Sequence, residues 1–87
     1  MSKSITIGLI GGYGLEEILE KKKWLKIKTK YGWPSDKVAI GEVAGQKVKV
    51  AVIPRHGQKH SIPPHKINHL ANIWTFYNLE AKFIIST

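Results

Sequence analysis

One arginine stands apart among the cations of this chain, because the other thirteen cationic side chains are all lysines. This residue, Arg55, comes just after a β-rich apolar run and stands beside His56. A planar guanidinium can hold two phosphate oxygens at once, and an imidazole can donate from one or both ring nitrogens to an oxyanion. We therefore predict an anion site at Arg55 and His56. The simpler alternative is that both are solvated loop residues.

A cluster of glycines offers a second place for an anion. At the end of the first apolar run stand Gly8, Gly11, Gly12 and Gly14. Glycine lets the backbone approach an anion closely, and the N–H groups at the start of a following helix point toward it. The dinucleotide-binding pattern is incomplete, because Glu17 occupies the place of its third glycine and no Walker lysine follows. A tight turn from strand to helix is the alternative explanation of these glycines.

The four histidines are separated by four, five and four residues: His56, His60, His65 and His69. This spacing is compatible with a metal site, but two of them lie in a proline-bounded loop and one precedes a helix. No cysteine or carboxylate accompanies them, although transition metals in proteins usually bind sets that include such ligands. We therefore expect no metal site.

Composition limits the class of protein. The 87 residues allow one small domain at most, and the absence of cysteine removes disulfides and thiolate chemistry. No apolar run approaches the roughly 20 residues of a membrane span, and no signal-peptide core follows the first residues. We therefore expect a soluble, cytoplasmic protein that binds no membrane.

The formal net charge of +8 favours anionic partners. Nucleic-acid-binding grooves combine cations with interleaved stacking rings. The lysines of this chain instead alternate with apolar residues, as the solvent-facing side chains of strands do: Lys26, Lys28, Lys30, Lys47 and Lys49. We therefore predict solvated strand faces and no nucleic-acid partner.

Hydrophobic patterns in the first half of the chain predict mostly strands. Continuous β-rich or alternating runs are typical of strands, and apolar residues at i, i+3 and i+4 are typical of a helix. The expected elements are a central strand over 5–10, a short amphipathic helix from Leu15 through the acidic and basic residues up to Lys23, a half-exposed strand over 24–30, turn residues over 31–36, and a hairpin of strands 38–43 and 47–53.

The second half predicts a crossover from strand to helix to strand. After an irregular loop over 54–64, an apolar stripe marks a helix buried on more than half its circumference, with these members: Ile67, Leu70, Ala71, Ile73, Trp74, Phe76 and Tyr77. Residues 81–86 show a second buried-strand pattern, and such a crossover implies parallel pairing. Because Thr87 directly follows an interior strand, we expect residues 1–87 to be part of one larger α/β domain with no internal boundary.

Together these blocks resemble the N-terminal part of the methylthioadenosine phosphorylases, in the trimeric branch of the purine nucleoside phosphorylases. The matching stretches follow one another along the whole chain: IGLIGGYGL at 7–15, YGWPSD at 31–36, PRHG at 54–57, His60, IPPHKIN at 62–68 and ANIW at 71–74. The resemblance implies an α/β fold, the incomplete N-terminal portion of a single phosphorylase-type domain with a central mixed β-sheet flanked by helices.

The same resemblance implies an enzyme that carries out phosphorolysis. Inorganic phosphate, as co-substrate and without a further cofactor, attacks the anomeric carbon of methylthioadenosine or a related purine nucleoside. The products are the free base and a pentose 1-phosphate, so the enzyme is a pentosyltransferase of purine and methionine salvage. The resemblance also implies a trimer or hexamer, whose subunit a C-terminal polypeptide of the same enzyme completes.

The family pattern assigns phosphate binding to Arg55, His56 and Thr87. It adds backbone contacts from the turn that contains Gly12 and Gly14. The group that assists the leaving base lies in later sequence of the family, so no catalytic residue is expected in this chain.

Two further positions of the pattern concern the same site. His60 is expected to shape the loop that carries Arg55. Tyr13 stands where the family usually has serine or threonine, and a phenol oxygen lies several ångströms further from the backbone than a serine hydroxyl. We therefore expect weaker or rearranged phosphate binding on the side of the site that the glycine turn forms.

A non-catalytic role remains the alternative. A module of this charge would bind phosphate, a nucleotide or an acidic partner through the same residues without any bond-breaking chemistry.

Overall fold

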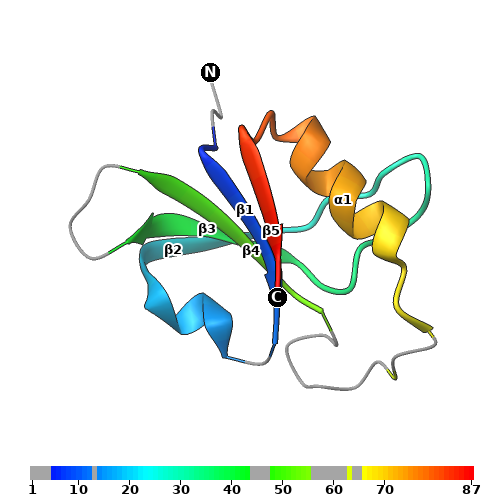
Figure 1. Ribbon diagram of the computed structural model, residues 1–87, viewed down its shortest axis with the longest axis horizontal. Coiled ribbons are helices and arrows are strands. Elements are labelled where there is room, and N and C mark those ends of the chain that lie inside the picture. Colours follow the sequence, from blue (N-terminus) through cyan, green and yellow to red (C-terminus); the bar gives the residue numbers. More distant parts are fainter. Residues whose placement is uncertain (1–4, 13, 44–47, 56–62, 64–65) are drawn as a thin grey trace.

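The computed structural model describes residues 5–12, 14–43, 48–55, 63 and 66–87 and shows a five-stranded mixed sheet with one α-helix (Figure 1). Along the chain the elements are β1 (Ile7–Gly11), a 3₁₀ helix η1 (Leu15–Ile18), β2 (Leu19–Leu25), β3 (Val38–Val43), β4 (Lys49–Pro54), α1 (His69–Asn78) and β5 (Phe83–Ser86). The strands lie in the order β2–β3–β4–β1–β5. The expected central mixed sheet is therefore confirmed.

β1 is an inner strand of this sheet, and it is parallel to both of its neighbours. Gly8 lies opposite Ala51 on β4 and opposite Ile84 on β5. The parallel pairing that the crossover pattern predicted is confirmed, and β1 lies between β4 and β5. The expectation of a buried, interior strand over 81–86 is wrong for the described residues, because β5 is the outer strand of this sheet and Phe83, Ile84 and Ile85 are exposed.

The other half of the sheet is antiparallel. β3 and β4 pair with Ala39 opposite Val52, and β2 continues the sheet on the outer side of β3. The expected hairpin is therefore confirmed, although its connection over 44–47 lies outside the described residues.

Alternation of side chains along the strands gives the sheet two apolar faces. On one face α1 packs over a cluster made of Ile5, Ile10, Val38, Ala51, Ile53, Phe76 and Leu79. On the other face a second cluster contains Leu19, Ala39, Val50 and Val52, and Leu15 of η1 packs against it. The helix and the 3₁₀ turn thus contribute to opposite faces of the sheet.

The expected first amphipathic helix is wrong beyond its first turn. Only Leu15–Ile18 are helical, as a 3₁₀ turn, and β2 begins at Leu19. A helix of one or two turns does not repay the cost of its nucleus, whereas Leu19 is buried in the second cluster and pairs with Val43 of β3. The lysine run therefore lies on an edge strand, with a register shift between Glu20 and Lys23.

The expected strand over 24–30 is also wrong in its bounds. β2 ends at Leu25, opposite Val38, the first residue of β3. Residues 26–30 extend past the start of β3 and have no partner strand there, so they form no continuous ladder. A bridge between Thr29 and Gly32 closes a tight turn instead.

The α-helix is confirmed, but the expectation of its buried face is only partly right. Its buried residues are Ala71, Asn72, Thr75 and Phe76, whereas Leu70, Ile73 and Tyr77 are exposed. The polar residues are buried because they have partners: the Thr75 hydroxyl donates to the carbonyl oxygen of Ala71 at 2.8 Å, and the Asn72 amide is bonded to Ser35. An apolar face of the helix therefore remains open. Within the described residues, no helix is long and apolar enough to cross a membrane.

Gly8 is required by the contact between β1 and α1. A Cβ atom built on Gly8 would lie 2.5 Å from Cγ of Phe76. Gly8→Ala is therefore expected to lower the free energy of unfolding by about 1–3 kcal/mol, measured by urea-induced unfolding. Gly12→Ala is the matched control, because a Cβ there meets nothing within 4 Å and should change the stability by less than about 0.5 kcal/mol. Equal losses in the two variants would contradict this account of the packing.

Candidate anion-binding site

The carboxyl ends of β4, β1 and β5 meet at one edge of the sheet, at the bottom of Figure 1. Gly11 lies opposite Pro54, and Ile10 lies opposite Ser86. The residues that follow these strands, Arg55 and Thr87, therefore flank the end of β1. Ligands of parallel sheets commonly bind at this edge.

Hydrogen bonds join Arg55 to the ends of β1 and β5. Its backbone N–H donates to the carbonyl oxygen of Gly11 at 2.8 Å, and its guanidinium Nη1 donates to the carbonyl oxygen of Thr87. The Thr87 backbone N–H in turn donates to the carbonyl oxygen of Ile10 at 2.9 Å. The structure thus brings together two of the predicted site residues that are 32 positions apart in the sequence.

The hydrogen bond to Thr87 uses only part of the donor capacity of the Arg55 guanidinium. A guanidinium has five N–H donors in one plane, and the bond to Thr87 engages Nη1. The residue is half-buried and the bond to Thr87 is exposed, so the positive charge lies at the sheet edge within reach of solvent. Such a group can bind an oxyanion through two parallel hydrogen bonds.

Gly11 allows Thr87 to come close to the end of β1. A Cβ on Gly11 would lie 2.9 Å from Oγ1 of Thr87 and would also clash with the Leu15 side chain. Gly11 therefore brings the Thr87 hydroxyl and η1 near the same strand end. The sequence pattern marked this glycine as a turn residue, and the structure shows that close packing requires it.

The glycine turn leads directly into η1. Gly14 has a left-handed backbone with φ 85°, and its carbonyl oxygen accepts from the N–H of Glu17 at 3.0 Å. Gly12 is half-buried and has open space beside it. Since η1 has only four residues, it supplies little of the helix dipole that the sequence pattern suggested.

Three predicted site residues, Tyr13, His56 and His60, lie outside the described residues. Their contribution, including the expected effect of Tyr13 on phosphate, stays a prediction. Among the described residues no three His, Cys, Asp or Glu side chains gather into a metal site. The expectation of no metal also stays a prediction, because three of the four histidines fall outside that part of the chain.

Sequence reasoning missed one polar residue beside the turn. Glu16 is only 5 % exposed, and its Oε1 has no hydrogen-bond partner among the described residues. The acidic pattern suggested a solvent-facing helix side, but the single 3₁₀ turn directs Glu16 inward. A buried, unpaired carboxylate oxygen is costly, and no local signal in the sequence distinguishes it from the exposed Glu17.

This chain is similar in sequence to several S-methyl-5′-thioadenosine phosphorylases. The S-methyl-5′-thioadenosine phosphorylase of Nitrosopumilus maritimus is 47% identical over 88 residues, covering 99% of this chain and 33% of the relative. That of Pyrococcus abyssi is 50% identical over 80 residues, covering 92% of this chain and 30% of the relative. This chain is homologous to the N-terminal part of these phosphorylases. No protein-family model matches it.

Solved structures of methylthioadenosine phosphorylases are similar to this chain in fold as well as in sequence. One from an Antarctic soil metagenomic library has a TM-score of 0.86 and 39% identity, over 98% of this chain and 30% of that chain. The apo enzyme of Schistosoma mansoni has a TM-score of 0.82 and 36% identity, over 95% of this chain and 30% of that chain. The chain thus spans about a third of the length of the relatives it matches.

The left-handed backbone of Gly14 gives a test of the turn. Gly14→Ala is expected to lower the free energy of unfolding by about 1–2 kcal/mol, because a Cβ disfavours positive φ. Gly14→Asn should cost less, since asparagine tolerates this conformation. Thermal and urea unfolding of the two variants measure the difference. An alanine variant as stable as the asparagine variant would show that the turn does not need this conformation.

Proposed function

We propose that this chain supplies the phosphate-binding wall of a purine nucleoside phosphorylase that acts on methylthioadenosine or a related purine nucleoside. The observation that carries the proposal is the meeting of the Arg55 guanidinium and Thr87 at the end of β1. It occurs in a chain that is 45–50% identical to S-methyl-5′-thioadenosine phosphorylases.

The chemistry of phosphorolysis explains why this chain needs a fixed cation. A phosphate oxygen forms a bond to the anomeric carbon while the glycosidic bond breaks, and the base leaves with the electron pair of that bond and takes up a proton. Inorganic phosphate is the co-substrate. Arg55, held by Thr87, would orient the phosphate and oppose its charge, and Gly12 and Gly14 would let the backbone approach it. Positioning of this kind accounts for a large part of catalysis in transfer reactions.

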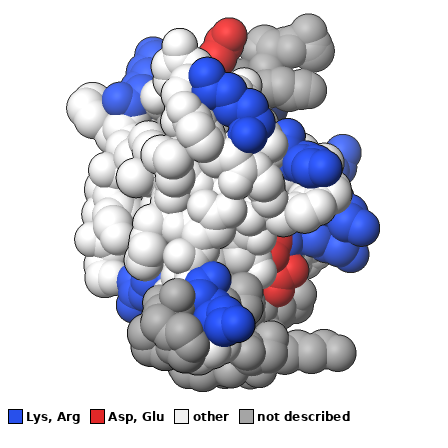
Figure 2. Space-filling view, turned by 90° about the vertical axis from the view of Figure 1, so that its right-hand side faces the viewer, with Lys and Arg blue, Asp and Glu red and all other residues white. Residues whose placement is uncertain are grey.

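The apolar surfaces of the chain support completion by a further polypeptide. The outer strand β5 exposes Phe83, Ile84 and Ile85 at 64%, 42% and 45%. Figure 2 shows a broad area without charged side chains on the face that carries α1, and the helix itself contains no charged residue. Exposed apolar area of this kind marks an interaction surface. The partner that fits is the remaining two thirds of a phosphorylase fold, and the completed subunit would form a trimer or hexamer.

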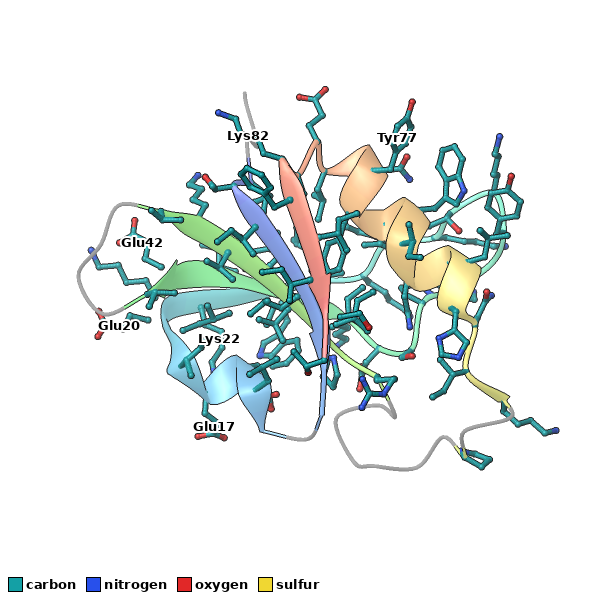
Figure 3. All side chains as sticks on the ribbon, viewed as in Figure 1. Glu17, Glu20, Lys22, Glu42, Tyr77 and Lys82 are labelled. Atoms are coloured by element: carbon teal, nitrogen blue, oxygen red, sulfur yellow. The ribbon has the colours of Figure 1, made fainter. Side chains whose placement is uncertain are left out.

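Phosphate binding by the chain tests the role of Arg55. Arg55→Ala should weaken the affinity for inorganic phosphate about 30- to 100-fold, the usual effect of losing a charged hydrogen bond. Arg55→Lys should recover only part of it, because an ammonium lacks the planar fork. Isothermal titration with phosphate measures the affinities of both variants. The control is Lys22→Gln, because Lys22 (Figure 3) lies on β2, the outer strand at the opposite edge of the sheet from β5. Equal affinities in the Arg55 and Lys22 variants would contradict the proposed wall.

Complementation tests the catalytic role. The chain is mixed with a polypeptide carrying the rest of the Nitrosopumilus maritimus phosphorylase, and complex formation is followed by size exclusion with light scattering. We expect a complex that releases adenine from methylthioadenosine only when phosphate is present. Ile73→Asp, on the exposed face of α1, should prevent the complex, whereas Lys22→Asp should not. A stable complex without phosphorolysis would support the non-catalytic alternative, and the absence of any complex would contradict the docking surface.

A further inference from the structure

The segment between β2 and β3 forms a surface of rings and lysines beside α1. Its exposed rings are Trp33, 49% exposed, and Tyr31, 41% exposed. Its cations are Lys26, Lys28 and Lys30, all exposed. We propose that this lysine–aromatic face, made of these five residues, binds single-stranded nucleic acid.

Each cation of this face lies within cation–π distance of a ring, about 6 Å or less from its centroid. Nζ of Lys26 and Nζ of Lys28 lie 5.5 Å and 5.7 Å from the ring centroid of Trp33. Nζ of Lys30 lies 5.4 Å from the centroid of Tyr31 and 4.6 Å from that of Trp74. The lysine–aromatic face therefore places every one of its three cations within reach of a ring, as proteins that bind single strands do.

Tyr31 also packs against Trp74 of α1, which in turn contacts Tyr77. The centroids of Tyr31 and Trp74 are 5.4 Å apart, and those of Trp74 and Tyr77 are 4.5 Å apart in an edge-to-face arrangement. Aromatic rings of this spacing stabilise each other. The half-buried Trp74 thus holds the ring of Tyr31 against α1.

Hydrogen bonds to α1 fix the segment that carries the face. The Asn68 side-chain amide donates to the carbonyl oxygen of Tyr31 at 2.9 Å. The buried Asn72 accepts from the N–H of Ser35 at 2.8 Å and donates to its hydroxyl at 3.1 Å. A rigid platform loses little conformational entropy when a ligand binds.

A depression next to Trp33 gives room for a ligand group. Its volume is about 360 Å³, and it is lined by Lys26, Ile27, Trp33, Pro34, Asp36 and Lys37. The lining includes one carboxylate, Asp36, and that carboxylate accepts the backbone N–H of Lys37 at 2.7 Å. Two lysines and an indole ring thus border a space large enough for a stacked base.

Nucleic acid fits this surface better than an acidic peptide does. Phosphates and bases alternate along a single strand, so each nucleotide offers one group to a lysine and one to a ring. An acidic peptide would use the lysines alone and leave Trp33 and Tyr31 exposed. The prediction of no nucleic-acid partner took Lys26, Lys28 and Lys30 for the solvent face of a strand. These lysines are exposed as expected, but β2 ends at Leu25, so they lie on an irregular segment where each has a ring nearby.

Binding of a labelled oligothymidine of fifteen nucleotides tests the proposal on the chain as it stands. Fluorescence anisotropy and quenching of tryptophan emission should report binding at low salt. The logarithm of the affinity should fall with the logarithm of salt concentration with a slope of about −2, as expected when three lysines contact phosphates. Absence of binding at low salt, or a stronger preference for an acidic peptide or for anionic vesicles, would overturn the proposal.

Variants locate the binding on this face. Trp33→Ala should lower the affinity roughly 5- to 150-fold, the effect of losing one stacked base, and Trp33→Phe should restore most of it. Lys28→Gln should reduce the salt slope, and Lys22→Gln, on β2, should leave both quantities unchanged. Circular dichroism verifies that each variant is folded. Arg55→Ala, at the sheet edge, separates this surface from the phosphate wall, and an oligonucleotide affinity that depends on Arg55 but not on Trp33 would overturn the proposal.

Discussion

The packing of the Phe76 ring on the backbone of Gly8 holds α1 against β1, the inner strand whose parallel register with both neighbours aligns the strand ends. Phe76 is fully buried, and the absence of a side chain at Gly8 lets the ring approach β1 directly. Because β1 pairs in parallel with both β4 and β5, its position sets where those strands end. Arg55 and Thr87 meet for this reason, and their hydrogen bond is a consequence of register rather than of sequence proximity.

Local patterns were sufficient for the strands whose pairing follows from apolar alternation. β1, β3, β4 and β5 were predicted because each carries a β-rich run that is visible without knowledge of its partner. The lysine-rich region failed because its structure depends on distant residues. β2 extends only as far as its partner β3, and the pairing ends with Leu25 opposite Val38, the first residue of β3. A charge pattern that is compatible with both a helix and a strand cannot reveal such a limit.

The candidate site shows the same division between local and long-range information. The residue type of Arg55 and the glycines of the turn indicated an anion site, and the family resemblance added Thr87. The orientation of the guanidinium required the parallel register, which no single segment contains. Glu16 was missed because its burial follows from the 3₁₀ geometry of η1 and not from its neighbours in sequence.

Asn72 connects the interior of the fold with its two open surfaces. Asn72 is fully buried and is hydrogen-bonded to Ser35. These bonds keep the polar side of α1 facing the sheet and the segment before β3. A buried amide without partners would be costly, so this rotation of the helix is favoured even though it leaves Leu70 and Ile73 exposed. The same bond holds the segment that carries Tyr31 and Trp33 against the helix. One satisfied polar group thus determines both the apolar face open to a partner and the lysine–aromatic face beside it.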